Sequence, residues 1–330
     1  MKIYLLIGCL GILSFAITYI SRLLAIRYKF IQFPNERSLH DVPTPKVGGI
    51  SIVITWYLGI SILFWFKVLE QNLYFALLSG ILLAIVSLID DLINLKPFIR
   101  LLVQFASAIL AFVFLNGLRP LIIPRIEINY LFIIYPLAII GMVWFINLFN
   151  FMDGVDGFAS IEAIIISIIL FYYSGNIINI LLIACISGFL FWNWPKAKIF
   201  MGDVGSTQLG FILIVLGIYF HNTFRFSILN WIMLSSPFWF DATLTLFRRW
   251  RNGEKLGQAH RKHAYQRIVQ AGYSHGMVDL FLILINAIII LMIFIYRKFV
   301  VTQIPIYFLS LLFLYFLTRL VDKKFPFTTK

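Results

Sequence analysis

Long apolar stretches, each bounded by a polar or glycine- and proline-rich cluster, recur from one end of the 330-residue chain to the other. A helix needs about 20 apolar residues to cross the hydrocarbon core of a bilayer, with roughly 17–25 the usual range. Dividing the chain at its polar clusters predicts eleven membrane-spanning helices, with ten as the alternative count. They cover 3–21, 49–66, 73–89, 98–115, 131–149, 158–173, 177–192, 207–220, 228–247, 277–296 and 303–318.

Composition supports this assignment to a membrane. Hydrophobic residues make up 61% of the chain and charged residues only 12%, whereas soluble domains carry roughly 45–50% apolar and about 25% charged residues. These proportions exclude a soluble enzyme, and we predict an all-α, polytopic membrane protein with a single domain over residues 1–330. The first stretch lacks the cleavage site of a signal peptide, so we expect it to remain as a span. Cys9 and Cys185 both lie in apolar stretches, which argues against disulfides and thiolate metal sites.

The net charge of +13 would suggest a nucleic-acid partner in a soluble protein, but its placement indicates topology. Eleven spans put alternate loops on opposite sides of the membrane, and one set of loops holds most of the 27 Lys and Arg residues. Only the following lie in the other set: Lys2, Lys67, Arg119, Arg125, Arg225, Arg297 and Lys298. By the positive-inside rule the basic side is cytoplasmic. We therefore predict an external N-terminus, a cytoplasmic C-terminus, and the lipid bilayer rather than nucleic acid as partner.

Aspartates gather at the predicted cytoplasmic ends of the spans, at positions 90, 91, 153, 156 and 203. Acidic residues contribute little to orientation, so they need a second explanation. Asp90 and Asp91 are adjacent at the C-terminal end of a predicted helix, where anions are unfavourable and two carboxylates repel each other. A bound cation would relieve both effects. The alternative is a solvated helix terminus.

A row of oxygen-bearing side chains follows the fifth predicted span. Asn147, Asn150, Asp153 and Asp156 recur every three residues, and near-helical geometry would gather their oxygens on one side. Carboxylate and amide oxygens suit Mg²⁺, with Mn²⁺ as the alternative metal. Asn, Asp and Gly are also turn residues, so a purely structural turn is the competing interpretation.

Two glycine-containing segments lie on the same predicted face. The loop before the second span contains Lys46 and the pair Gly48-Gly49, where a backbone can approach a ligand closely, although by itself this loop also fits an ordinary basic connector. The segment 200–207 can expose backbone N–H groups to a phosphate. Within it, Asp203 is a candidate metal ligand and Phe200 a flat surface for a base.

The largest predicted cytoplasmic loop, 248–276, holds three of the five histidines and is expected to meet the substrate. His260, Arg261 and His263 lie close together in the sequence, a grouping that suits a pyrophosphate or a sugar better than a metal. The arginines at the start of the loop fit anchoring at the membrane surface: Arg248, Arg249 and Arg251.

At these loops the chain resembles the polyprenyl-phosphate N-acetylhexosamine-1-phosphate transferases, glycosyltransferase family 4. Five motifs occur in order over nearly the whole chain. They are the Pro-Thr-Pro-Lys-Val-Gly-Gly loop, Asp90-Asp91, Asn147-x-x-Asn150-x-x-Asp153-Gly-x-Asp156-Gly, Phe200-Met-Gly-Asp203-x-Gly-Ser206 and the histidine loop.

The resemblance implies that the phosphate of a polyprenyl (undecaprenyl) phosphate attacks the β-phosphorus of a UDP-N-acetylsugar and releases UMP. It implies Mg²⁺ held by Asp203, with Asn150 as a second ligand. Asp90 and Asp91 look like the pair that binds or deprotonates the lipid phosphate, with direct attack and a covalent intermediate both open. The remaining implied site residues are Asp153 and Asp156 as catalytic and nucleotide-contacting groups, and Lys46, Gly154, Val155, Phe200, His260, Arg261 and His263 as substrate-binding groups.

The variant of the histidine loop, with Gln258 where several relatives carry Asp, looks most like the branch that initiates O-antigen synthesis. That branch uses UDP-GlcNAc or 6-deoxy donors such as UDP-FucNAc and UDP-QuiNAc. The resemblance places the protein in a bacterial inner membrane with a cytoplasmic active site, and leaves open whether it is a homodimer. The alternative from another class is a secondary transporter or flippase with acidic ion-coupling residues. Carboxylates at one face and the lack of an internal repeat argue against it.

Overall fold

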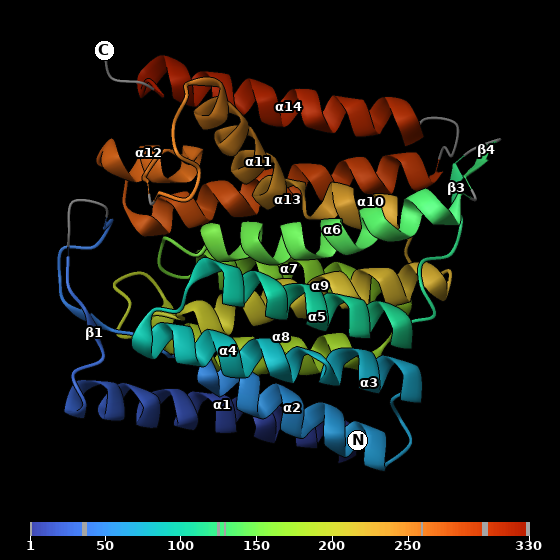
Figure 1. The fold of residues 1–330 in the computed structure, drawn as a ribbon, viewed down its shortest axis with the longest axis horizontal. Coiled ribbons are helices and arrows are strands. Elements are labelled where there is room, and N and C mark those ends of the chain that lie inside the picture. Colours follow the sequence, from blue (N-terminus) through green and yellow to red (C-terminus); the bar gives the residue numbers. More distant parts are fainter. Residues whose placement is uncertain are drawn as a thin grey trace.

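The helices of the protein lie side by side in one bundle with loops at both ends (Figure 1). The structure, a computed structural model, describes residues 2–34, 38–123, 126–128, 130–258, 260–298 and 303–327. The hairpin of β3 (Leu121–Ile123) and β4 (Ile126–Ile128) lies at one end of the bundle, and the short ladder of β1 (Ile31–Gln32) and β2 (Thr44–Pro45) lies at the other. The sequence pattern predicts neither ladder.

Most of the predicted spans are confirmed as helices. They are α1 (Lys2–Arg27), α2 (Ile50–Trp65), α5 (Pro97–Phe114), α6 (Leu131–Phe151), α7 (Phe158–Ser174), α8 (Ile177–Asn193), α9 (Asp203–Asn222), α13 (His275–Lys298) and α14 (Gln303–Lys324). The stretch at 73–89 is covered by α3 (Gln71–Leu78) and α4 (Gly80–Ile93). Within the described residues, seven helical segments are long and apolar enough to cross a membrane, and three shorter apolar helices accompany them. The prediction of an all-helical polytopic membrane protein is confirmed at that level.

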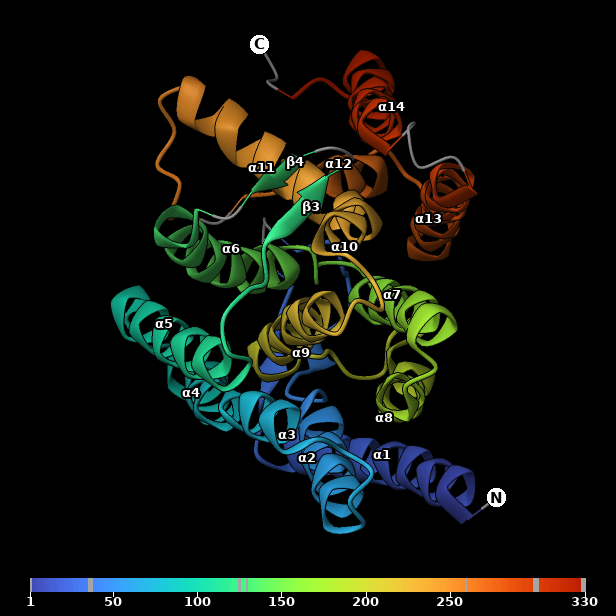
Figure 2. The ribbon, with the colours of Figure 1, turned by 90° about the vertical axis from the view of Figure 1, so that its right-hand side faces the viewer.

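One predicted span, 228–247, is not a continuous helix, and that prediction is wrong. The chain forms α10 (Ile228–Leu234) and α11 (Ser236–Arg251), which runs obliquely across the bundle (Figure 2). Pro237 lies in the first turn of α11, where its missing N–H is tolerated but where a helix passing through would lose a hydrogen bond. The Trp239 indole N–H donates to the carbonyl of Ile232 at 2.7 Å and so satisfies one of the carbonyls left over at the break.

Helix α9 occupies the centre of the bundle (Figure 2). Its apolar stretch is entirely buried, mainly by α6 and α4. Gly210 allows α6 to come close, since a Cβ at this position would lie 3.0 Å from Phe149 and 3.1 Å from Ile146. The predicted span began at 207, whereas the helix begins at Asp203. The first turn of α9 therefore brings Asp203 to the middle of one end of the bundle.

Candidate active site

A cavity of about 590 Å³ opens at the end of the bundle where α9 begins. It gathers side chains from segments far apart in the sequence, as expected if the aspartate-bearing ends of the helices lie on one face. The predicted site residues that line it are Lys46, Asp90, Asp91, Asn150, Asp153, Gly154, Val155, Asp156, Phe200 and Asp203. It is also lined by residues with no predicted role, among them Arg100, Gln266 and His275.

Asp91, near the end of α4, caps the N-terminus of α9. Its carboxylate accepts hydrogen bonds from the backbone N–H of Asp203 at 3.1 Å and of Val204 at 3.0 Å. Gly202, with φ +76°, lies so close that a Cβ would be 2.8 Å from the carboxylate. An anion at this position satisfies N–H groups that have no partner within the helix. Asp91 therefore has a structural role in addition to the predicted one.

We expect Asp91→Ala to lower the free energy of unfolding by about 1–2 kcal/mol, because removal of a carboxylate cap typically costs that much. Turnover should fall as well, because the bond from the Asp203 N–H fixes the start of α9. Thermal unfolding in detergent, followed together with activity, measures both effects. Lost turnover with an unchanged melting temperature would assign Asp91 to the chemistry instead of the cap.

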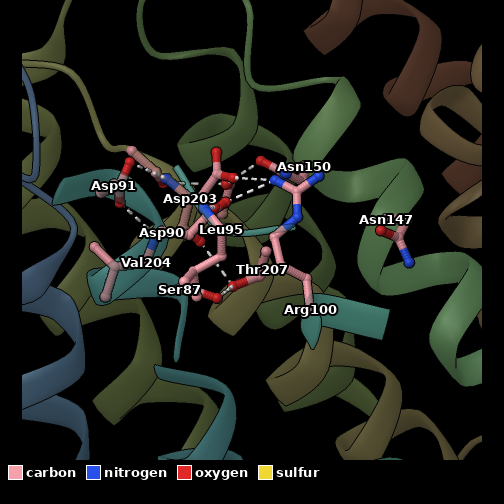
Figure 3. Close-up of polar contacts among 12 residues, drawn as sticks. Ser87, Asp90, Asp91, Leu95, Arg100, Asn147, Asn150, Asp203, Val204 and Thr207 are labelled. Carbon is pink, nitrogen blue, oxygen red and sulfur yellow. Dashed lines mark hydrogen bonds and ion pairs between the residues drawn. The ribbon is translucent and has the colours of Figure 1, made fainter. Parts of the chain in front are cut away.

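Asp90 and Asp203 are joined by Arg100 of α5 (Figure 3). The Arg100 guanidinium lies 2.6 Å from the Asp90 carboxylate and 3.3 Å from that of Asp203. Asp90 also accepts a hydrogen bond of 2.6 Å from the N–H of Leu95, in the short turn between α4 and α5. That turn is what brings the first turns of α5 beside the end of α4. The short turn was the only sequence feature that could have placed Arg100 beside Asp90. The charge pattern alone indicates that Arg100 contributes to the orientation of the protein in the membrane.

The row predicted from the three-residue spacing forms only in part. The Asn150 side chain faces α9, where its Oδ1 accepts a hydrogen bond of 2.7 Å from the Ser206 hydroxyl. Asn147 lies apart from the aspartates (Figure 3) and exchanges hydrogen bonds of 2.6 and 3.2 Å with the side chain of Gln104. Three residues fall short of the 3.6 of a helical turn, so positions at this spacing rotate away from one another.

The loop after α6 carries the other two aspartates. The Asp153 carboxylate is half-buried and makes no hydrogen bond or ion pair within the described part of the chain. Burial, followed by the nearby charges of Asp203, Asp91 and Asp156, raises the pKa of Asp153 well above its ordinary value. Asp156, in contrast, accepts from the N–H of Ala197 at 3.1 Å and pairs with the His275 imidazole at 3.0 Å.

The two glycine-containing segments are bound to each other by their backbones. Gly48 and Gly49 donate to the carbonyls of Phe200 and Met201, each at 2.8 Å. Gly49 packs directly on Gly205, where neither position has room for a side chain. The ring of Phe200 lies against His40, with 4.8 Å between centroids, and borders the cavity. Stacking of Phe200 on a base stays a prediction.

The histidine loop is placed differently from its predicted role. His260, Arg261 and His263 are not among the residues lining the cavity. His263 precedes α12 (Ala264–Gln270) and is only 2% exposed. Burial, with the charge of Arg249 contributing, lowers the pKa of His260 and of His263 to about 3, so both side chains are neutral at pH 7. Ala259 lies outside the described residues.

The loop contacts the cavity wall through Arg261 and reaches the cavity itself through α12. The Arg261 guanidinium donates to the carbonyl of Ser38, a residue of the cavity wall, at 3.3 Å. Gln266 of α12 lines the cavity directly. The Tyr265 hydroxyl donates to the carbonyl of Phe151 at 3.0 Å and packs against Gly154 so closely that a Cβ there would collide with it. Direct contact of His260, Arg261 and His263 with substrate stays a prediction.

The oxygen donors in the cavity fit Mg²⁺. No group of three or more His, Cys, Asp or Glu side chains within the described residues is arranged as a metal cluster, but Mg²⁺ usually takes one or two carboxylates and completes its shell with water and phosphate. The Asp203 side chain is 34% exposed towards the cavity, and the bond from Ser206, one turn along α9, places Asn150 beside it. Burial, followed by the like charges of Asp203, Asp91 and Asp156, raises the pKa of Asp153, and a cation among these carboxylates would favour their ionised forms.

Comparisons with known proteins identify the family of the chain. Residues 73–221 match the family described as glycosyl transferase family 4. The chain is 30% identical to a Bacillus subtilis (strain 168) protein named probable undecaprenyl-phosphate N-acetylglucosaminyl 1-phosphate transferase, over 94% of the chain and 91% of that protein. It is 25% identical to the decaprenyl-phosphate N-acetylglucosaminephosphotransferase of Mycolicibacterium smegmatis, over 82% of the chain and 77% of that protein. It is 28% identical to the undecaprenyl-phosphate alpha-N-acetylglucosaminyl 1-phosphate transferase of Thermotoga maritima, over 78% of the chain and 80% of that protein.

Proposed function

The chain belongs to glycosyl transferase family 4, as a membrane enzyme of the phospho-N-acetylhexosamine transferase class, and from this premise we propose its reaction. It transfers an N-acetylsugar 1-phosphate from a UDP-sugar to polyprenyl phosphate and releases UMP. The proposed donor is UDP-GlcNAc, because the relatives named above act on N-acetylglucosamine. UDP-FucNAc and UDP-QuiNAc are the alternatives. Because the chain belongs to this family of transferases, we no longer propose the alternative of a secondary transporter or flippase.

One observation carries the proposal, namely the meeting of five aspartates from three separate segments in one cavity with Arg100 and Lys46. Phosphoryl transfer needs mainly positioning and neutralisation of charge on the transferred group. Acidic side chains alone would repel phosphates, whereas acidic side chains paired with cations at the end of a membrane bundle suit a lipid phosphate and a nucleotide. Asp203 and Asn150 would hold Mg²⁺, which supplies neutralisation of the pyrophosphate when bound.

In the proposed reaction an oxygen of the polyprenyl phosphate forms a bond to the β-phosphorus of the donor, and the bond from that phosphorus to the UMP oxygen breaks. Asp90 and Arg100 bind and orient the lipid phosphate, with Asp90 taking its proton where it carries one. The segment from Asp153 to Asp156 contacts the nucleotide, and Phe200 stacks on the uracil. The products are a polyprenyl diphospho-sugar and UMP.

We further propose that the cavity faces the cytoplasm of a bacterial cell, with an external N-terminus, because the basic loops lie at that end. Residues 1–330 act as one domain, in which 248–276 is the substrate loop. The product initiates O-antigen or another surface polysaccharide. We propose that the protein forms a homodimer. Measurement of the mass of the detergent-solubilised protein tests this.

We expect purified protein, supplied with undecaprenyl phosphate and Mg²⁺, to release UMP from UDP-GlcNAc and to stop when the metal is chelated. The same assay with UDP-FucNAc and UDP-QuiNAc assigns the donor by the ratio of kcat/KM values. Omission of the polyprenyl phosphate is the control, because UMP released without it would be simple hydrolysis. Failure to release UMP from any donor would refute the proposed reaction.

A further inference from the structure

The end of α14 is tied to α11 and α12 by a cluster of charges around Asp322. Arg248 of α11 donates to the Asp322 carboxylate through both terminal nitrogens, each at 2.9 Å, and Arg267 of α12 donates to it at 2.8 Å. Arg267 is only 5% exposed and also donates to the carbonyl of Phe325 at 2.7 Å. A carboxylate shared by two guanidinium groups makes strong, directional contacts. Three elements are therefore held together at the end of the bundle that carries the cavity.

An aromatic contact completes this cluster. The ring of Phe327 lies 5.4 Å from the guanidinium carbon of Arg248, and 5.5 Å from both the Lys262 ammonium and the guanidinium carbon of Arg267. Cations over an aromatic face are attracted to it, more strongly where water is excluded. We call Arg248, Arg267, Asp322, Phe325 and Phe327 the C-terminal clamp.

The clamp holds the helix whose other side forms part of the cavity. Arg267 is one residue after Gln266, which lines the cavity, and two after Tyr265, which packs on Gly154 in the proposed nucleotide-contacting segment. The α12 helix has only seven residues, which is too short to be stable without tertiary contacts. Its position therefore depends on what holds it, and the clamp is one of its anchors. Two further contacts hold it: Asp241 accepts from the N–H of Ala264 at 2.9 Å, and the carbonyl of Phe151 accepts from the Tyr265 hydroxyl at 3.0 Å.

We infer that the C-terminal clamp positions α12 for donor binding, with Asp322 as a positioning residue that acts through Arg267 on Gln266 and Tyr265. The inference rests on the proposed function, which makes this cavity the donor site. Asp90, Arg100 and Asp203 belong to other elements and stay in place when the clamp is lost. The loss consequently weakens the binding of the nucleotide sugar and leaves the binding of polyprenyl phosphate unchanged.

The test compares Asp322→Ala with Lys323→Ala, which removes the exposed charge next to it on α14. Asp322→Ala is expected to raise KM for the UDP-sugar about tenfold, with kcat and KM for polyprenyl phosphate changed less than about twofold. Lys323→Ala is expected to match wild type, and Asp322→Glu to recover most of the loss. Phe327→Ala, beyond the last helix, tests the clamp without altering α14. An unchanged donor KM in both clamp variants, or an equal rise in both KM values, overturns the inference.

A second measurement does not depend on activity. Tryptic cleavage within 251–258, at exposed sites such as Lys255, should be faster in Asp322→Ala than in Lys323→Ala, because α12 and the loop before it are released. Equal cleavage rates would overturn the clamp even if the kinetics changed. If the wild-type protein released no UMP, the proposed function would fail, and the cleavage rates alone would decide the clamp.

Discussion

Asp203→Asn should abolish turnover, with kcat reduced by at least about 10³-fold, while the bundle remains folded. The substitution preserves size but removes the charge that faces the cavity at the first residue of α9. A carboxylate that holds the metal and balances Arg100 contributes several kcal/mol to the neutralisation of a transferring phosphoryl group, and about 4 kcal/mol corresponds to 10³ in rate. The fold should lose little, because an anion in the first turn of a helix is worth about 0.3–1 kcal/mol.

The measurement combines UMP release at increasing Mg²⁺ with the binding of Mn²⁺ to the protein, followed by its paramagnetic resonance signal. We expect the variant to lose both turnover and tight Mn²⁺ binding, with its melting temperature close to that of wild type. Asp41→Asn is the matched control, since Asp41 is exposed in the loop between α1 and α2 and does not line the cavity. Retained turnover in Asp203→Asn would remove this residue from the metal site.

Much of the fold follows from the spacing of apolar stretches, because a helix that crosses a bilayer must satisfy its backbone internally and present apolar side chains over its whole length. The exception at 228–247 has a local cause. Ser235, Ser236 and Pro237 are too short a run to interrupt the apolar pattern, yet Pro237 cannot pass through a helix interior without loss of a hydrogen bond. Apolar content predicts one span here, whereas the structure has two helices that meet at Ser235, just before Pro237.

The candidate site was predictable to the extent that each residue sits at the end of a helix. The basic loops place the helix ends that carry Asp90, Asp153 and Asp203 on one side of the membrane, and in the structure all three line one cavity. The histidine loop was harder to predict, because a loop of that length has no periodicity to fix its path. The neutral His263 is buried as the residue before α12, and the cavity wall is formed by Gln266 three residues later.

Arg100 is the cavity residue whose importance the sequence conceals. Its guanidinium pairs with Asp90 and Asp203 and is 39% exposed, so it keeps donors available to a phosphate. Lysine and arginine at helix ends ordinarily set the orientation of a membrane protein, and the position of Arg100 fits that role too. Only the packing of α5 against α4 distinguishes it from Lys96, which is exposed at the start of α5 and does not line the cavity.

We expect Arg100→Ala to lower kcat/KM by on the order of 10²–10³-fold, the range observed when one preorganised donor to a developing charge is removed. Two effects add: the phosphates lose a bidentate partner, and Asp90 and Asp203 repel them without the intervening cation. Arg100→Lys should recover only part of the activity, because an ammonium can replace the one terminal nitrogen that contacts both carboxylates but lacks the other N–H donors that the guanidinium keeps for a phosphate. Lys96→Ala, which removes a positive charge from the residue directly before the same helix, should leave the rate unchanged. If both variants lost activity equally, the effect would be one of net charge at the membrane surface, and the bridge between Asp90 and Asp203 would have no special role.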